Sequence, residues 1–169
     1  MDGEDALSGP RCEGGAVSGA PGGAKMVKLA PRGDTIAAGD TLKVDLFVNG
    51  VYKARGVQFT IDAVTADGKN VEFVDWSIDT SEGNYLFAGH ETYSAVDSNR
   101  GRLLIVSAEG SVDCEDECYV ATALFIVTAD TSGPVTLELN QTHSQLRDTT
   151  NQLIQPETIT AATVTVIGE

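Results

Sequence analysis

The strongest constraint on the fold is an alternation of apolar and polar residues in two neighbouring segments, residues 41–51 and 57–62, which is strict in the second. In the second segment the apolar and polar positions are Val57, Gln58, Phe59, Thr60, Ile61 and Asp62. Side chains point alternately to the two faces of a strand, so each segment has one apolar and one polar face. A strand that buries one face needs a second layer to bury it against. The alternation therefore predicts a layered β-structure.

Further strand-like segments follow one another with turn residues between them, and none has apolar residues at helical spacing. The predicted strands, besides the two above, are residues 26–31, 71–76, 85–90, 102–109, 119–129, 135–139, 144–147 and 159–167. Asn49-Gly50 is predicted to end the 41–51 strand. Residues 102–109 are apolar almost throughout, which is typical of a central strand buried on both faces. About nine short strands without helices predict an all-β, antiparallel sandwich.

The first 25 residues differ from the rest in composition. They hold seven glycines and two prolines, and no periodic apolar face. Such a segment buries too little surface to offset its ordering entropy. We therefore predict a flexible linker or arm at 1–25, with ordering on a neighbouring subunit as the alternative, and one sandwich domain at 26–169. The first residues have no apolar signal-peptide core, so no signal peptide is visible in this chain.

The charge and the motifs exclude several functions. The net charge of −14 argues against nucleic-acid binding, and no apolar run is long enough for membrane insertion. A strongly acidic chain favours a partner with basic residues. No phosphate loop, nucleophile motif or metal-ligand spacing is present, and His90 and His143 have no partner set near them in the sequence. We expect no cofactor, no metal and no enzymatic activity.

Cys114 and Cys118 are the only closely spaced cysteines. In an extended strand they would lie about 13 Å apart, but a tight turn brings such a pair within the roughly 5.5–6 Å that a disulfide prefers. A disulfide is favoured over a metal or redox site, and it indicates an oxidising compartment. Three interpretations of Cys12 stay open: a free thiol, an intermolecular disulfide or the remnant of a lipidation site.

Two further residues suggest modification or sugar binding. Asn140 begins an Asn-Gln-Thr triplet, the pattern for N-glycosylation. Trp76 is the only tryptophan and ends the 71–76 strand, where alternation places it with Glu72 and Val74, opposite Val71 and Phe73. It is either a platform for stacking sugars or a buried residue at the sandwich edge, and burial is the more common environment of tryptophan.

The order of these segments resembles a cohesin module. The resemblance runs over residues 26–29, 38–51, 56–62, 71–74, 101–107, 120–127, 133–139, 146–148 and 158–166. Cohesins are nine-stranded jelly-roll sandwiches that bind dockerin modules. The resemblance therefore implies a non-catalytic, extracellular or cell-surface module with a dockerin-like protein partner.

In cohesins the partner lies across a sheet face formed by the third, fifth, sixth and eighth strands. The resemblance implies that Gln58, Thr60 and Asp62 contact the partner here, with Tyr85 and Glu109 nearby. Two other functions remain open. The chain could be a structural subunit that associates with copies of itself through the N-terminal arm. It could also be a carbohydrate-binding module for a polysaccharide, which its 6% aromatic content disfavours.

Overall fold

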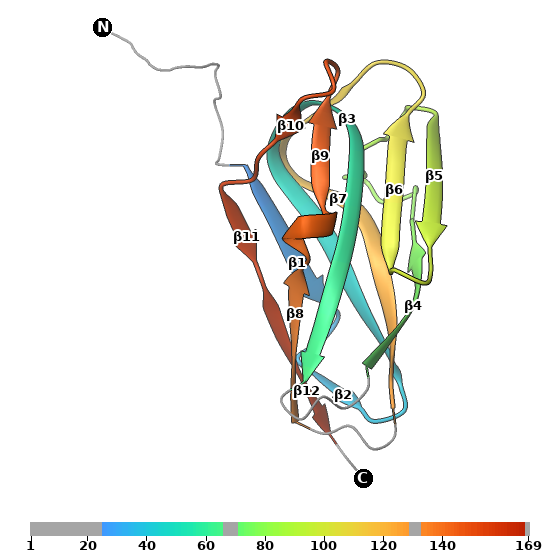
Figure 1. Ribbon diagram of the computed structural model, residues 1–169, viewed down its shortest axis with the longest axis vertical. Coiled ribbons are helices and arrows are strands. Elements are labelled where there is room, and N and C mark those ends of the chain that lie inside the picture. The colour runs from blue at the N-terminus through green and yellow to red at the C-terminus, as the bar shows by residue number, and fades with distance from the viewer. Residues whose placement is uncertain (1–24, 66–70, 129–132, 168–169) are drawn as a thin grey trace, which may run out of the picture.

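The computed structural model describes residues 25–65, 71–128 and 133–167, which form an elongated β-sandwich (Figure 1). Residues 1–24, with Cys12 and almost all of the predicted arm, lie outside the described residues. The described part holds twelve strands and one short 3₁₀ helix. Their bounds are β1 Met26–Pro31, β2 Thr35–Ala37, β3 Thr41–Thr65, β4 Val71–Ser77, β5 Thr92–Asp97, β6 Arg102–Ser107, β7 Val112–Val127, β8 Gly133–Leu139, η1 Gln141–His143, β9 Gln145–Asp148, β10 Leu153–Ile154, β11 Thr158–Thr160 and β12 Ala162–Ile167.

The two layers share one strand. In the first layer, here called the β7 sheet, the order is β11, β1, the first half of β3, β7 and β4. In the second, the β6 sheet, β5 pairs with β6, which pairs with the second half of β3. Along its other edge, the second half of β3 pairs first with β9 and then with β8. β8 in turn pairs with β12, and β12 pairs with β2. Figure 1 shows β3 turning over at the top of the molecule to pass from one layer to the other.

The sequence prediction that Asn49-Gly50 ends a strand was wrong, because β3 is continuous through it. The chain kinks there instead. Gly50 and Lys53 have positive φ angles of 67° and 57°, and the register against β7 shifts twice between Asn49 and Ala54. A left-handed backbone turns the strand without breaking all of its pairing. One strand therefore contributes to both sheets.

The core lies between the sheets and contains the apolar positions that the alternation predicted to face inward. Both halves of β3 contribute to it, with Leu42, Val44, Leu46 and Val48 from one sheet and Val57, Phe59 and Ile61 from the other. These residues are all almost fully buried. The prediction of an all-β sandwich is confirmed. The prediction of a strand at residues 85–90 was wrong. These residues form turns, and only Tyr85 makes a single β-bridge, to Tyr119.

A bulge in β4 reverses the predicted orientation of Trp76. The register against β7 shifts between Phe73 and Asp75, so Phe73 and Trp76 both turn towards the core. The two ring centroids lie 6.4 Å apart. Trp76 is only 5% exposed, and its indole Nε1 donates a hydrogen bond of 2.9 Å to the Gly101 carbonyl. Trp76 is therefore a core residue and is not available as a platform for sugars.

The predicted disulfide between Cys114 and Cys118 is present, with the Cα atoms 6.2 Å apart. Its setting differs from the expected turn, because both residues lie within β7. Val48 is opposite Cys118 and Val51 is opposite Cys114, so β7 accommodates one extra residue where β3 kinks. This bulge shortens the strand enough for the two sulfur atoms to meet.

Replacing both Cys114 and Cys118 by alanine is expected to lower the free energy of unfolding by about 2 kcal/mol, because the unfolded chain gains the entropy of a short open loop. Urea titration followed by circular dichroism measures the change. Wild-type protein treated with dithiothreitol serves as the control and should lose a similar amount, whereas the variant should not respond to the reductant. Equal stability of oxidised, reduced and substituted chains would contradict the expectation.

Candidate functional site

The outer face of the β6 sheet is the surface to which the resemblance directs attention. Directly opposed residues of an antiparallel pair share a face, so the strand registers define its members. The outward positions are Tyr93, Ala95 and Asp97 on β5, Arg102, Leu104 and Val106 on β6, Gly56, Gln58, Thr60, Asp62 and Val64 on β3, Gln145 and Arg147 on β9, and Thr136 and Glu138 on β8. We call this set the β6 face.

The centre of the β6 face is apolar and open. Leu104 is 40% exposed and lies between Ala95 and Gln58, while the neighbouring Val106 is half-buried. Tyr93 lies opposite Val106 and is 67% exposed. The sequence predicted that this strand is buried on both faces, which is wrong for these positions. Exposed aromatic and aliphatic side chains at the centre of a surface are typical of a protein interface.

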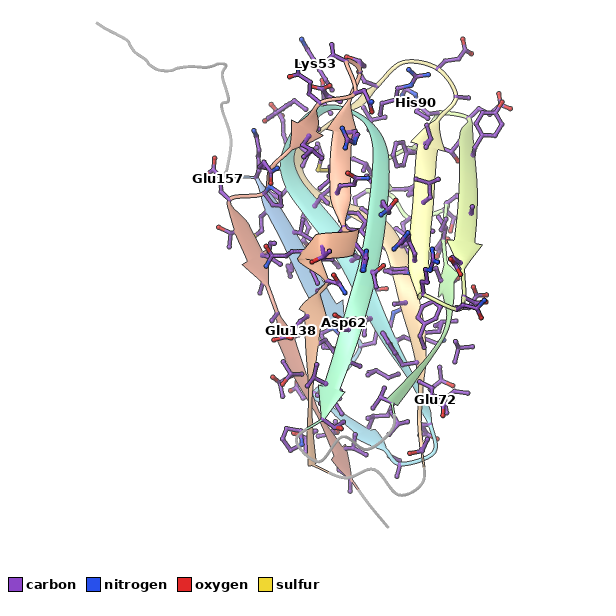
Figure 2. All side chains as sticks on the ribbon, in the orientation of Figure 1. Lys53, Asp62, Glu72, His90, Glu138 and Glu157 are labelled. Atoms are coloured by element: carbon purple, nitrogen blue, oxygen red, sulfur yellow. A yellow bond between two sulfur atoms is a disulfide. The ribbon has the colours of Figure 1, made fainter. Side chains whose placement is uncertain are left out.

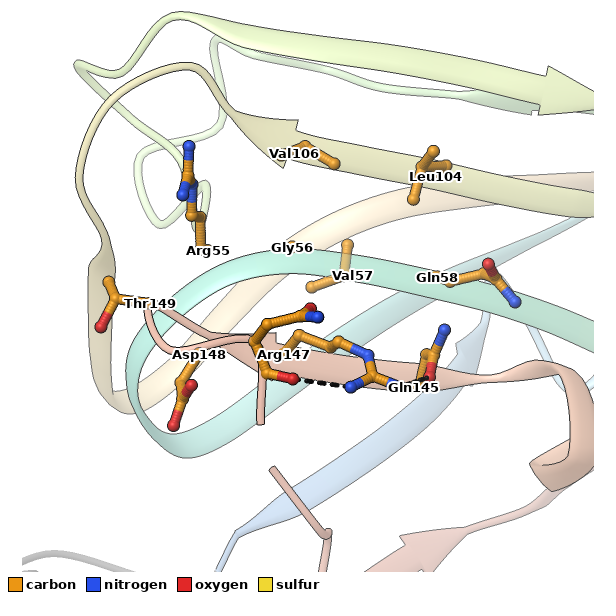
Figure 3. A pocket seen from close by; sticks show the side chains of 11 residues that line it. Arg55, Gly56, Val57, Gln58, Leu104, Val106, Gln145, Arg147, Asp148 and Thr149 are labelled. Carbon is orange, nitrogen blue, oxygen red and sulfur yellow. Dashed lines mark hydrogen bonds between the residues drawn. The ribbon is translucent and has the colours of Figure 1, made fainter. Parts of the chain in front are cut away.

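A hollow of about 400 Å³ opens beside this apolar centre, between β6 and β9 (Figure 3). Gly56, Val57, Leu104 and Val106 line its apolar part, and Arg55 and Arg147 lie at its edge. A Cβ atom added to Gly56 would contact Val106 Cγ2 at 3.6 Å, which is an ordinary packing distance. The missing side chain of Gly56 therefore leaves space that another apolar group can fill.

Asp148 organises the loop that forms one wall of the hollow. One oxygen of its carboxylate, Oδ1, accepts hydrogen bonds from the Thr150 amide at 2.8 Å, the Thr150 hydroxyl at 2.7 Å and the Gln152 amide at 3.0 Å. Arg147 donates to the Asn151 carbonyl at 2.7 Å. The hydrogen bonds to the carboxylate, led by that from the Gln152 amide and then that from the Thr150 hydroxyl, hold the pKa of Asp148 below its ordinary value.

This loop is expected to loosen in acid. Because the pKa of Asp148 is lower in the folded state, its contribution to stability is present above the unfolded pKa of about 3.9 and is lost as the pH falls through the folded pKa. In a pH titration by NMR, the amide resonances of Thr150 and Gln152 should shift together, with a midpoint below 3.9. The Asp148→Asn variant keeps an acceptor oxygen and should show no titration. A midpoint at or above the ordinary value would contradict this interpretation.

The part of the β6 face around Thr60, beside the open centre, is covered by η1 and by Ser144, whose hydroxyl accepts a hydrogen bond of 3.1 Å from the Thr60 amide. Gln58 Nε2 donates to the His143 carbonyl at 3.0 Å, and an Arg102 guanidinium nitrogen donates to His143 Nδ1 at 3.0 Å. Beneath this contact Thr60 is only 5% exposed. The Thr60 hydroxyl oxygen and Arg102 Nε are buried, and neither has a hydrogen-bond partner in the described part of the chain. The expectation that Thr60 is exposed was therefore wrong.

The other residues proposed from the sequence lie in different places. Asp62 is exposed and lies directly opposite Glu138 across the β3–β8 pair (Figure 2). Tyr85 is 7% exposed and packs against Tyr119 of β7 with ring centroids 6.4 Å apart, so it is not on the β6 face. Glu109 is exposed in the turn after β6. The Asn140 side chain accepts a hydrogen bond from the His143 amide at the start of η1.

Several residues of the face could not be found from the sequence pattern. Leu103 and Leu104 are adjacent and both apolar, which hides the alternation that turns Leu104 outward. Gly56 precedes the alternating run, and its role depends on the neighbouring β6 and β9 strands. Arg55 and Arg147 meet at the hollow although 92 positions separate them along the chain (147 − 55).

The outer face of the β7 sheet, by contrast, is occupied by its own hydrogen bonds. Arg32 donates to both oxygens of Asp45, at 3.0 and 2.9 Å, and the Thr122 hydroxyl donates to Asp45 at 2.6 Å. The Tyr119 hydroxyl lies 2.8 Å from that of Thr122 and accepts from the Asp79 amide. The hydrogen bond to Asp45 also raises the pKa of Arg32. This network holds the loop after β4 and leaves the β6 face as the better candidate site.

Neither a metal centre nor a membrane span is found in the described part of the chain. No group of three or more His, Cys, Asp or Glu side chains there could hold a metal ion. No helix among the same residues is long and apolar enough to cross a membrane. The β6 face combines an apolar centre, a hollow and charged side chains at its edges.

The fold is that of cohesin modules. No protein-family model and no curated protein matches the sequence. Among solved structures, the cohesin of the OlpC cohesin–dockerin complex from Clostridium thermocellum is 12% identical, with a TM-score of 0.59 over 86% of this chain and 95% of that chain.

Two further structures agree with this fold. The third ScaC cohesin of Acetivibrio cellulolyticus, in complex with the ScaB dockerin, is 14% identical, with a TM-score of 0.58 over 85% of this chain and 100% of that chain. A non-cellulosomal cohesin from the archaeon Archaeoglobus fulgidus is 14% identical, with a TM-score of 0.54 over 85% of this chain and 92% of that chain. At such low identity the likeness defines the fold, and the predicted cohesin-like jelly-roll sandwich is confirmed.

Proposed function

We propose that this chain is a non-catalytic, extracellular protein-binding module that recognises a dockerin-like partner through its β6 face. The observation that carries the proposal is the open apolar centre formed by Leu104, Val106 and Tyr93. A monomer gains nothing in stability by exposing such a group, whereas an interface uses it as a buried anchor. Structures with the same fold that are described as cohesin–dockerin complexes support the choice of partner.

Residues around this centre are suited to the rim of an interface. Gln58 is half-buried and Asp62 is exposed, so both remain in the proposed contact. Thr60 supports the face from below, and Tyr85 no longer belongs to it. The disulfide between Cys114 and Cys118 supports an oxidising, extracellular setting.

The two alternative functions have less support. The burial of Trp76 removes the tryptophan that a carbohydrate-binding module would have used for stacking. Assembly through the N-terminal arm concerns residues outside the described part of the chain. The protein-binding function is therefore preferred.

The test is calorimetric titration of the protein with a panel of purified dockerin modules, including those from the Clostridium thermocellum and Acetivibrio cellulolyticus complexes. At least one dockerin is expected to bind with one-to-one stoichiometry. Sedimentation with insoluble polysaccharides and sedimentation velocity of the protein alone serve as parallel assays. Failure of every dockerin, together with co-sedimentation or self-association, would replace the proposed function with one of the alternatives.

A further inference from the structure

The β6 face carries opposite charges at its two ends. Arg55 and Arg147 lie at the hollow, whereas Asp62 and Glu138 face outward together on β3 and β8. Gly56 and Asp62 are six positions apart on β3, which corresponds to about 20 Å of strand. That length exceeds the Debye length of about 8 Å at physiological ionic strength. A partner therefore encounters the two ends as separate electrostatic environments.

The lining of the hollow keeps a net positive charge, because it holds Arg55 and Arg147 and only one carboxylate, Asp148. Arg55 is exposed and takes part in no ion pair or hydrogen bond within the described residues. Arg147 donates only to neutral groups, the Asn151 carbonyl and the Gln145 side-chain oxygen. Asp148 is near, but one of its oxygens already accepts three hydrogen bonds from its own loop. The hollow thus combines an apolar floor with unpaired guanidinium groups.

From this combination we infer that the hollow over Gly56 accepts one aliphatic or aromatic side chain of the protein partner, flanked by carboxylates that pair with Arg55 and Arg147. The inference rests on the proposed function and specifies the partner's contact segment. A basic residue further along the partner then lies towards Asp62 and Glu138. The partner therefore binds in one direction along the strands, since reversing it would place like charges together.

This inference reverses the expectation drawn from the net charge of −14, which favours a basic partner. Bulk charge acts on the approach of a partner over long distances and is screened by salt. Contact specificity depends on the groups that meet, and a guanidinium pairs with a carboxylate in a directed, bidentate geometry. The contact segment of the partner is acidic at the hollow even if the remainder of the partner is basic.

The β6 face of a second copy of this chain would also place acidic groups opposite the arginines and basic groups opposite the carboxylates. Rotating one β6 face by half a turn places Asp62 and Glu138 of one copy over Arg55 and Arg147 of the other. The net charge of −14 on each copy opposes this association, however, and a separate partner without that charge avoids the repulsion. We therefore assign the hollow to a separate protein, and self-association becomes an outcome that the experiment can detect.

The test selects ligands for the hollow from a phage-displayed library of random dodecapeptides. Wild-type protein is the bait, and the Gly56→Leu variant, whose new side chain fills the hollow, removes peptides that bind elsewhere. The selected peptides are expected to carry Leu, Ile, Met or Phe next to Asp or Glu. The affinity of a selected peptide should fall at least tenfold on the Arg55→Glu variant. Lys43→Glu makes the same charge change on the outer face of the β7 sheet and should have no effect.

Three results would overturn the inference. They are hollow-dependent peptides without acidic residues, equal losses from Arg55→Glu and Lys43→Glu, and the absence of any peptide that distinguishes wild type from Gly56→Leu. Sedimentation velocity showing a wild-type dimer that Arg55→Glu dissociates would assign the face to a second copy instead. If Gly56→Leu fails to fold, as judged by circular dichroism, Arg55→Glu takes its place in the counter-selection.

The outcome is independent of the dockerin panel. If no dockerin binds but acidic peptides are selected, the proposed partner class is wrong and the preference of the hollow stands. If a dockerin binds and its affinity is unchanged by Gly56→Leu and Arg55→Glu, the proposed function stands and this inference fails.

Discussion

Replacing Leu104 by arginine is expected to weaken binding of the protein partner by at least about 30-fold, which corresponds to roughly 2 kcal/mol. Leu104 occupies the centre of the β6 face, and 40% of it is exposed in the free protein. An interface that buries this position would have to desolvate a charge in place of an aliphatic group. The fold should tolerate the change, because the arginine side chain can extend into solvent.

The matched control is Ile126→Arg, which introduces the same charge at a similarly exposed position, 44%, on β7. Calorimetry with a dockerin that binds the wild type gives the two affinities, and urea titration gives the two stabilities. The Leu104 variant should lose affinity while the Ile126 variant keeps it. If both variants bind as the wild type does, the partner does not use the β6 face.

Replacing Trp76 by alanine is expected to lower the free energy of unfolding by about 3–5 kcal/mol. The indole lies in the core next to Phe73, and its nitrogen donates to the Gly101 carbonyl. Its removal leaves a cavity beside Phe73 and an acceptor without its donor. For a domain of this size such a loss is a large fraction of the total stability.

The Trp76→Phe variant separates the two contributions, because phenylalanine keeps much of the packing but cannot donate the hydrogen bond. Its destabilisation should be clearly smaller than that of Trp76→Ala. Urea titration followed by far-ultraviolet circular dichroism is suitable, since both variants lack tryptophan fluorescence. A loss below about 1 kcal/mol for the alanine variant, typical of an ordinary substitution, would show that the bulge does not bury this residue.

The sequence pattern was sufficient to predict core residues where the alternation within one strand alone determines which of its faces is buried. The alternation from Val57 to Ile61 identified core residues correctly, because the two-residue period leaves only one way to bury the apolar set. The pairing of Cys114 with Cys118 could likewise be inferred from their spacing. Both conclusions depend on residues that are neighbours in the sequence.

The predictions failed where a neighbouring element decides the outcome. No feature of the segment around Thr60 indicates that η1 covers it. The burial of Trp76 was the favoured prediction, but the alternation assigned it to the wrong face because a bulge against β7 turns it inward. Leu104 was hidden by its apolar neighbour, and Arg147 reaches the hollow only through the pairing of β9 with β3. The candidate site is assembled from such long-range contacts, so less of it than of the fold could be predicted.

The continuous strand β3 also bears on how the domain folds. It pairs with β1 and β7 in one layer and with β6, β9 and β8 in the other, more partners than any other strand of the described part has. Neither layer can be completed, or lost, without the strand that also belongs to the other, and this couples them into one cooperative unit. All of its partners except β1 lie far away along the chain, and domains dominated by such non-local pairing reach their native state slowly, on a scale of milliseconds to seconds.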